Sequence, residues 1–333
     1  MKRNYPAFLV TLFTVILFAS CKKDGGSAEA PIVPVMPDTL SSGWTSINLD
    51  TALYGGVAFA DIYFYNNTTG YAVGNALWKS TNGGVSWQRA VSSPQGVNMS
   101  VTPNGTLFVV PYFTGNGLSK STDGAVSFST IYPFVPDQFN DIFFTGNDTG
   151  YMSTNLGILR TVNAGNNWAA VSASGLPTGG ALYSSLFFFN DNLGWICDSS
   201  NVYRTNGNIN TWTKSIIHNT TPFSRVHSIY ATSPSNIYLA VSSGEIFKST
   251  DGGINFYLKS ARFSNSISWS DMHFVNDNTG YITFGKRIYK TTDGGSTWQV
   301  VVALGEKGVV EVHFTDASHG WACANGLLLR YNL

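Results

Sequence analysis

The sequence predicts an all-β protein, a seven-bladed β-propeller with four-stranded antiparallel blades, from three observations. An aromatic residue recurs at intervals of 43, 41, 40, 44, 44 and 42 residues, the length of one propeller blade. A polar, glycine-bearing turn precedes most of these aromatics, and a second motif recurs between them. The recurring aromatics are Trp44, Trp87, Phe128, Trp168, Trp212, Phe256 and Trp298.

The composition suits this fold and excludes some functions. Of 333 residues, 43% are hydrophobic and 14% aromatic, enough for a large core. Only 11% are charged, against about 25% in an average globular protein. Because 19 Lys and Arg balance 19 Asp and Glu, no net field attracts nucleic acid. We expect no nucleic-acid partner and no cofactor.

The N-terminal segment has the pattern of an export signal. Lys2 and Arg3 precede Ala7–Ala19, an uncharged and mostly apolar run too short to span a bilayer. The run ends at Phe18-Ala19-Ser20-Cys21, which resembles the lipobox of lipoproteins, in which the cysteine is lipidated. The alternative is an ordinary secretory signal. We therefore expect a protein of the cell envelope, lipid-anchored through Cys21 at the outer membrane or cell surface.

Three domains follow from this reading. Residues 1–20 are the predicted lipoprotein signal peptide, 21–42 a flexible tether with three prolines, and 43–333 the propeller. Within the propeller, Trp44 has no turn motif before it, and the member after Trp298 would fall at about position 340, beyond Leu333. The sequence thus predicts that an N-terminal strand around Trp44 closes the ring in blade seven.

The first repeat signature is the turn before each aromatic. Asp and Asn side chains accept hydrogen bonds from nearby backbone amides and glycine tolerates positive φ, so Thr291-Thr292-Asp293-Gly294-Gly295 and its copies predict hairpin turns. Gly207 replaces the acid in an eroded copy. The motif resembles the Asp-box, or bacterial neuraminidase repeat. The predicted structural Asp-box residues are Asn82, Asp123, Asn163, Asp251 and Asp293.

The second signature is a phenylalanine followed six and seven residues later by a glycine and an aromatic, as in Phe64 and Gly70-Tyr71. Each copy predicts strand, turn, strand. Together the two signatures resemble the repeats of the photosystem II stability and assembly factor family. That resemblance covers residues 44–333 and implies a non-enzymatic assembly or stability factor.

Candidate functional residues stand three positions before each inner-strand aromatic, where the innermost strands open onto the central channel. Carboxylates at four of these positions are suited to a cation or a polyhydroxylated ligand, whereas the structural alternative is that they cap backbone amides. The predicted channel-mouth set is Asp61, Asn98, Asp141, Ser185, His227, Asp271 and Glu311.

Three other residue sets have structural and functional interpretations. His273 and His313 occupy equivalent positions in adjacent blades. They are candidate metal ligands, or they replace aromatic residues of the core. A basic residue precedes each turn, either covering apolar strand edges or forming a face for an anionic partner. Cys197 and Cys323 lie in different blades, so we expect buried thiols and no disulfide.

The enzyme alternative is a glycoside hydrolase, because sialidases also carry Asp-boxes. Only Arg225, Arg262 and Arg287 remain outside the signal and the repeats, without the context of a sialidase arginine triad. Paired carboxylates among the channel-mouth set leave hydrolysis open. The sequence favours a membrane-anchored binding protein whose propeller face takes a protein complex of the envelope or a glycan. No catalytic residue is assigned.

Overall fold

The computed structural model describes residues 38–47, 49, 58–91, 94–112, 117–131, 139–154, 157–177, 183–218, 223, 225–261 and 271–333. All belong to one compact unit, Met36–Leu333. The predicted signal peptide, Cys21 and Arg262 lie outside these ranges, so the predictions made for them stay predictions. Among the described ranges there is no helix with the length and apolar character needed to span a bilayer.

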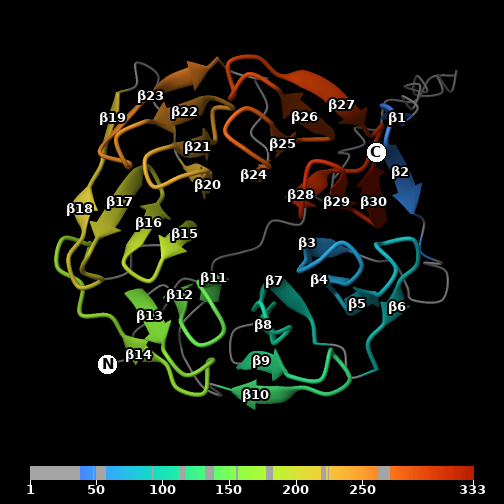
Figure 1. Ribbon diagram of the computed structural model, residues 1–333, viewed down its shortest axis with the longest axis horizontal. Helices are drawn as coiled ribbons and strands as arrows, with labels where there is room; N and C mark the ends of the chain where they lie inside the picture. Colours follow the sequence, from blue (N-terminus) through green and yellow to red (C-terminus); the bar gives the residue numbers. More distant parts are fainter. Residues whose placement is uncertain are drawn as a thin grey trace, which may run out of the picture. The chain divides into compact units, whose positions relative to one another are not determined.

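The strands form seven sheets arranged in a ring (Figure 1). Blade one contains β3 (Phe59–Phe64), β4 (Gly70–Gly74), β5 (Leu77–Ser80) and β6 (Gln88–Arg89). Blade two contains β7 (Gly96–Val101), β8 (Leu107–Pro111), β9 (Leu118–Ser121) and β10 (Ser129–Ile131). Blade three contains β11 (Phe139–Phe144), β12 (Gly150–Thr154), β13 (Gly157–Thr161) and β14 (Ala169–Ala170). Blade four contains β15 (Ser185–Asn190), β16 (Leu193–Asp198), β17 (Asn201–Asn206) and β18 (Thr213–Lys214).

The other three blades follow the same meander with additions. Blade five contains β20 (Val226–Ala231), β21 (Ile237–Val241), β22 (Ile246–Ser249) and β23 (Asn255–Ser260), with β19 (Ile216–His218) beside β23. Blade six contains β24 (Met272–Phe274), β25 (Gly280–Phe284), β26 (Arg287–Thr291) and β27 (Gln299–Ala303), with β1 (Thr39–Leu40) beside β27. Blade seven contains β28 (Val309–Phe314), β29 (His319–Ala324), β30 (Leu327–Asn332) and β2 (Trp44–Ile47).

The predicted closure of the ring is confirmed. Strand β2 pairs antiparallel with β30, with Trp44 opposite Tyr331 and Ile47 opposite Leu328. Strand β1 adds a contact that the sequence did not predict, because it pairs with β27 in blade six. Residues 39 and 40 were predicted as tether, yet they form this fifth strand. The N-terminal chain thus pairs with two blades and covers both of their outer edges.

Aromatic packing explains both repeat signatures. Within a blade, the inner-strand phenylalanine meets the recurring tryptophan edge to face, as Phe274 meets Trp298 at 6.1 Å and 79°. Across five of the seven seams it stacks on the aromatic of the preceding blade, as Phe188 stacks on Tyr151 at 3.7 Å. The glycine of the second signature lies directly under this ring, and a Cβ at Gly150 would come within 2.7 Å of Phe144. Any larger residue there would displace the phenylalanine.

The Asp-box residues lie in the turns as predicted. The Oδ1 atom of Asp293 accepts hydrogen bonds from the amides of Ser296 and Thr297, both at 2.9 Å, and Asp123, Asp251, Asn82 and Asn163 accept equivalent bonds. These bonds lower the pKa of Asp293. Burial raises the pKa of Asp251, but the bonds from Asn255, Ser249 and Ile254 outweigh it and hold that pKa at about 2.

The basic residues before these turns connect adjacent blades. Lys79 donates a hydrogen bond to the carbonyl of Gly124 in blade two at 2.7 Å, and Lys120 donates to that of Ala164 in blade three at 2.6 Å. Arg330 of blade seven donates through Nε to the carbonyl of Gly83 in blade one at 2.8 Å. At these three seams, the structural interpretation of the basic positions is supported.

Candidate functional site at the mouth of the central channel

The seven channel-mouth candidates surround one cavity. It has a volume of about 810 Å³ and lies where the innermost strands of the blades begin. All of Asp61, Asn98, Asp141, Ser185, His227, Asp271 and Glu311 line it. The Asp-box turns lie at the opposite end of the blades. Each inner strand begins at the cavity and ends at a turn that contacts an Asp-box, as the hydrogen bond from Gly83 N–H to Thr68 O shows in blade one. The cavity therefore opens on the face without Asp-boxes.

A local backbone irregularity aims these side chains. The register of the inner strand shifts by one residue just before Asp61, Asn98 and Glu311, as in a β-bulge. Bulges redirect side chains and are common beside functional sites. Here the extra residue turns a polar side chain toward the neighbouring blade.

In blade five the register differs from the one predicted. Ala231, opposite Ile237, occupies the place that Phe64 has in blade one, so Ser228 is the residue equivalent to Asp61. The sequence pattern had matched Tyr230 to Phe64, and it therefore selected His227, one residue before Ser228. His227 still lines the cavity, where burial and the charge of Arg225 lower its pKa to about 4, so it is neutral at neutral pH.

Hydrogen bonds cross all seven seams at this level of the ring. Three are accepted by a side chain from a backbone amide of the next blade, three join two side chains, and one is donated by a serine hydroxyl to a backbone carbonyl. The bonds are Met99 N–H to Asp61 (2.6 Å), Asn98 to Asp141 (3.2 Å), Leu186 N–H to Asp141 (2.9 Å), Ser184 to Val226 O (2.9 Å), Ser228 to Asp271 (3.3 Å), Val312 N–H to Asp271 (3.3 Å) and Glu311 to Asp61. We call this set the seam ring.

The carboxyl groups of the seam ring hold their protons unusually tightly. Burial raises the pKa of Asp61 and of Asp141 to about 7, and that of Asp271 to about 6. Burial and the nearby Asp61 carboxylate raise the pKa of Glu311 well above its usual range. Glu311 is therefore the protonated partner, and it donates its proton to Asp61 in their hydrogen bond.

An aromatic collar lies one layer deeper in the channel. Adjacent rings contact each other at centroid distances of 4.4 to 5.3 Å, and the only blade without a ring among the described strands is blade two, which supplies Ser100. The collar consists of Tyr63, His313, His273, Tyr230, Phe187 and Phe143.

The two histidines take the places of core aromatics in this collar. His313 bonds the carbonyl oxygen of Phe64 at 2.8 Å through Nε2, and His273 contacts His313 edge to face at 5.1 Å. Burial lowers the pKa of His313 to about 4 and that of His273 well below its usual value. In the part of the chain that the structure describes, no three His, Cys, Asp or Glu side chains are grouped to hold a metal ion.

The geometry limits which chemistry one carboxyl pair can perform. Glycosidase carboxyl pairs stand about 5 to 9.5 Å apart, to fit a sugar or a water between them. Asp61 and Glu311 instead share a hydrogen bond, so no substrate atom fits between them. Asp141 and Asp271 are each bonded to amides of the next blade. The mouth of the channel thus offers carboxyl groups with raised pKa values, amides, hydroxyls and one guanidinium, a surface suited to hydrogen bonding.

Sequence reasoning missed Ser184, Ser228 and Arg225. Ser184 and Ser228 carry seam-ring bonds, and Arg225 is the one cation that lines the cavity among the described residues. Ser184 and Ser228 are each next to a predicted residue and Arg225 is two positions from one, so only the strand register could have separated them from the predicted set. Cys197 and Cys323 are buried, unpaired thiols, as predicted, and burial raises the pKa of both.

The fold and the site define a class: a single-ring, seven-bladed propeller of Asp-box repeats with a polar cavity at its axis. The model of the photosynthesis system II assembly factor YCF48 family matches residues 36–332. The chain belongs to this family, as its repeats predicted. No similar protein was found among the curated proteins.

Solved structures show the same fold. A structure described as YCF48 bound to D1 peptide has 23% identity and a TM-score of 0.70, with 89% of this chain and 98% of that chain covered. YCF48 from Cyanidioschyzon merolae has 18% identity and a TM-score of 0.69, covering 87% and 99%. The GH74 enzyme of Niastella koreensis has 16% identity and a TM-score of 0.60, but only 50% of that chain is covered.

Proposed function

We propose that this chain is a membrane-anchored, non-enzymatic binding protein that assists the assembly or stability of a protein complex of the cell envelope. The observation that carries the proposal is the family match along residues 36–332. A peptide-bound relative of the same fold supports a protein as the partner. The anchor in this proposal is the lipidated Cys21, which would hold the propeller close to its partner at the outer membrane or cell surface.

We place the partner's contact at the mouth of the channel. The cavity of about 810 Å³ has room for several side chains, and its groups suit hydrogen bonds to a peptide backbone. The carboxyl groups of the seam ring bond to the neighbouring blades, and they also line the cavity. These bonds therefore hold the blades, and with them the walls of the cavity, in place. A preformed cavity reduces the entropy cost of binding.

The test is affinity capture from native membranes with the full, lipidated chain as bait. We expect one envelope protein complex to be retained by the wild type and lost with His227→Ala, which changes the cavity wall without removing a seam-ring bond. Lys286→Ala, in the exposed turn between β25 and β26 and not among the residues that line the cavity, is the control and should retain the complex. Capture that is equal with all three baits contradicts the channel as the contact site.

Two further measurements separate the alternatives. A glycan array with a hydrolysis readout tests carbohydrate recognition, and glycan binding without capture of a protein complex would contradict the proposal. Labelling with radioactive palmitate should mark the wild type but not Cys21→Ser. Equal labelling, or none, contradicts the anchor but leaves the choice of partner to the capture experiment.

A further inference from the structure

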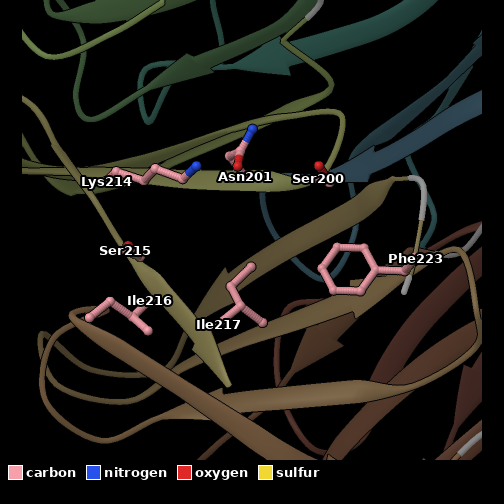
Figure 2. A pocket seen from close by; sticks show the side chains of 7 residues that line it. All are labelled: Ser200, Asn201, Lys214, Ser215, Ile216, Ile217 and Phe223. Atoms are coloured by element: carbon pink, nitrogen blue, oxygen red, sulfur yellow. The ribbon is translucent and has the colours of Figure 1, made fainter. Parts of the chain in front are cut away.

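A second cavity lies on the outside of the ring, where the chain passes from blade four to blade five. Strand β18 ends at Lys214 in blade four, and β19 begins at Ile216 as an added strand of blade five. The two strands diverge from Ser215 and leave a wedge-shaped pocket of about 540 Å³ (Figure 2). Its walls are Ser200, Asn201, Lys214, Ser215, Ile216, Ile217 and Phe223. We call it the wedge.

One wall of the wedge is the edge of a β-strand. Strand β19 pairs in parallel with β23, and Ile216 N–H donates to Ile254 O at 2.8 Å. Successive residues of a strand direct their backbone groups to opposite sides, so the N–H and C=O of Ile217 point away from β23. Ile217 lines the wedge, and among the described strands none pairs with β19 on this side, where one more strand could add.

The side chains of the wedge combine an apolar floor with one charge. Ile217 and Phe223 are half-buried, line the pocket and pack against the same hydrophobic cluster of blades four and five. Lys214 is the only charged residue among those that line it, and it is exposed. Ile216 is 55% exposed beside it. The chemistry favours an apolar side chain with a carboxylate close by.

The wedge adjoins the channel cavity along the seam between blades four and five. Ser199 and Arg225 line the channel cavity, whereas Ser200 and Phe223 line the wedge. A hydrogen bond of 2.6 Å from Val226 N–H to Ser199 O joins the two blades between them. A segment leaving the channel mouth at this seam would pass Arg225 first and Lys214 second, so both cations on this path favour an acidic segment.

We propose that the wedge binds an extended, acidic segment of the partner protein, which adds as a strand to the edge of β19. An apolar side chain of the segment fills the space between Ile217 and Phe223, and an acidic side chain pairs with Lys214. This proposal rests on the proposed function and deepens it, because it names the part of the partner that is recognised. The channel mouth and the wedge are then two parts of one binding surface.

The test uses selected peptides, because they can be measured apart from the native complex. Random twelve-residue peptides displayed on phage are selected on the full chain in detergent, and the enriched sequences are synthesised with a fluorescent label. We expect a consensus of alternating apolar and acidic residues without proline. Fluorescence anisotropy should show at least a tenfold loss of affinity with Lys214→Glu and none with Lys286→Glu, the charge-matched control.

A charge exchange gives the specific readout. Replacing the acidic residue of the best peptide by lysine should restore its binding to the Lys214→Glu protein, which a merely misfolded variant would not allow. The proposal is overturned if the selection yields no such peptides or if they bind the Lys214→Glu protein as well as the wild type. Peptides that respond to His227→Ala alone would also overturn it, while leaving the proposed function intact.

Discussion

The indole of Trp44 packs edge to face against Phe314 at 6.1 Å and 86°, although the two residues lie at opposite ends of the propeller sequence. The same contact joins Trp298 to Phe274 inside blade six, at 6.1 Å and 79°. Trp44 therefore supplies to blade seven the aromatic ring that the other blades supply from the residue after their own turn.

Trp44→Ala should destabilise the whole propeller. Trp44 is 5% exposed and contacts Tyr281, Phe314 and Tyr331, and replacing a buried tryptophan by alanine typically costs about 3–5 kcal/mol. Urea unfolding followed by circular dichroism measures the loss. Val91→Ala, at a position 98% exposed, is the control and should change little. An unchanged midpoint for Trp44→Ala would show that the ring does not depend on its closing strand.

The glycine of the second signature should not tolerate a methyl group. Gly150→Ala places a Cβ against the ring of Phe144, and such overpacking typically costs about 1–3 kcal/mol. Gly146→Ala, in the same blade with open space around its Cβ position, is the matched control. Adding Phe144→Leu should recover part of the lost stability. A Gly150→Ala protein as stable as the control would contradict our explanation of the motif.

The seam ring predicts a loss of stability as pH rises from about 4 to 7. The pKa values of Asp61, Asp141 and Asp271 are raised to about 7, 7 and 6, so the folded state binds more protons than the unfolded state in this window. Stability is then greatest below the unfolded pKa and falls as pH rises through the folded pKa. Urea midpoints measured between pH 6.5 and 8, above the ordinary pKa of histidine, should decrease.

Glu311→Gln provides the control for this pH dependence. An amide can still donate to Asp61 but cannot ionise, so the variant should fold and its midpoint should fall less steeply with pH. The lowered pKa values of His227, His273 and His313 in the same cavity act in the opposite direction below about pH 6.5, because these histidines gain protons there in the unfolded state and not in the folded state. A midpoint that rises between pH 6.5 and 8, where the histidines no longer contribute, would contradict the assignment.

The basic positions before the Asp-box turns should matter for stability and not for partner capture. Lys79→Met keeps the apolar stem but loses the bond to Gly124 O, which typically costs about 1–3 kcal/mol for a charged donor. Thermal unfolding measures this loss. We expect the variant, once folded, to capture the same envelope complex as the wild type. Lost capture without lost stability would instead favour an anionic partner face.

The sequence predicted what repeats and missed what depends on pairing. Blade number, closure by Trp44, the turns and the unpaired cysteines follow from spacing, and the structure confirms them. The positions of β1 and β19 could not be read from the sequence, because two or three residues carry no period and their partners lie far away in the chain. The choice of His227 over Ser228 failed for a related reason. In blade five Ala231 stands where other blades have the phenylalanine that marks the register, and the aromatic Tyr230 lies one residue earlier.

The pairing of Trp44 with Tyr331 also sets the order in which the domain is completed. The partners are 287 residues apart (331 minus 44), so their contact closes nearly the whole chain into a loop. During synthesis β2 emerges early and remains unpaired until β30, the last strand of the propeller, has been made. Blades one to six can form beforehand, whereas blade seven forms only after translation has reached its final residues. Strand β2 is thus made before strands β3 to β30 and is among the last to find its partner.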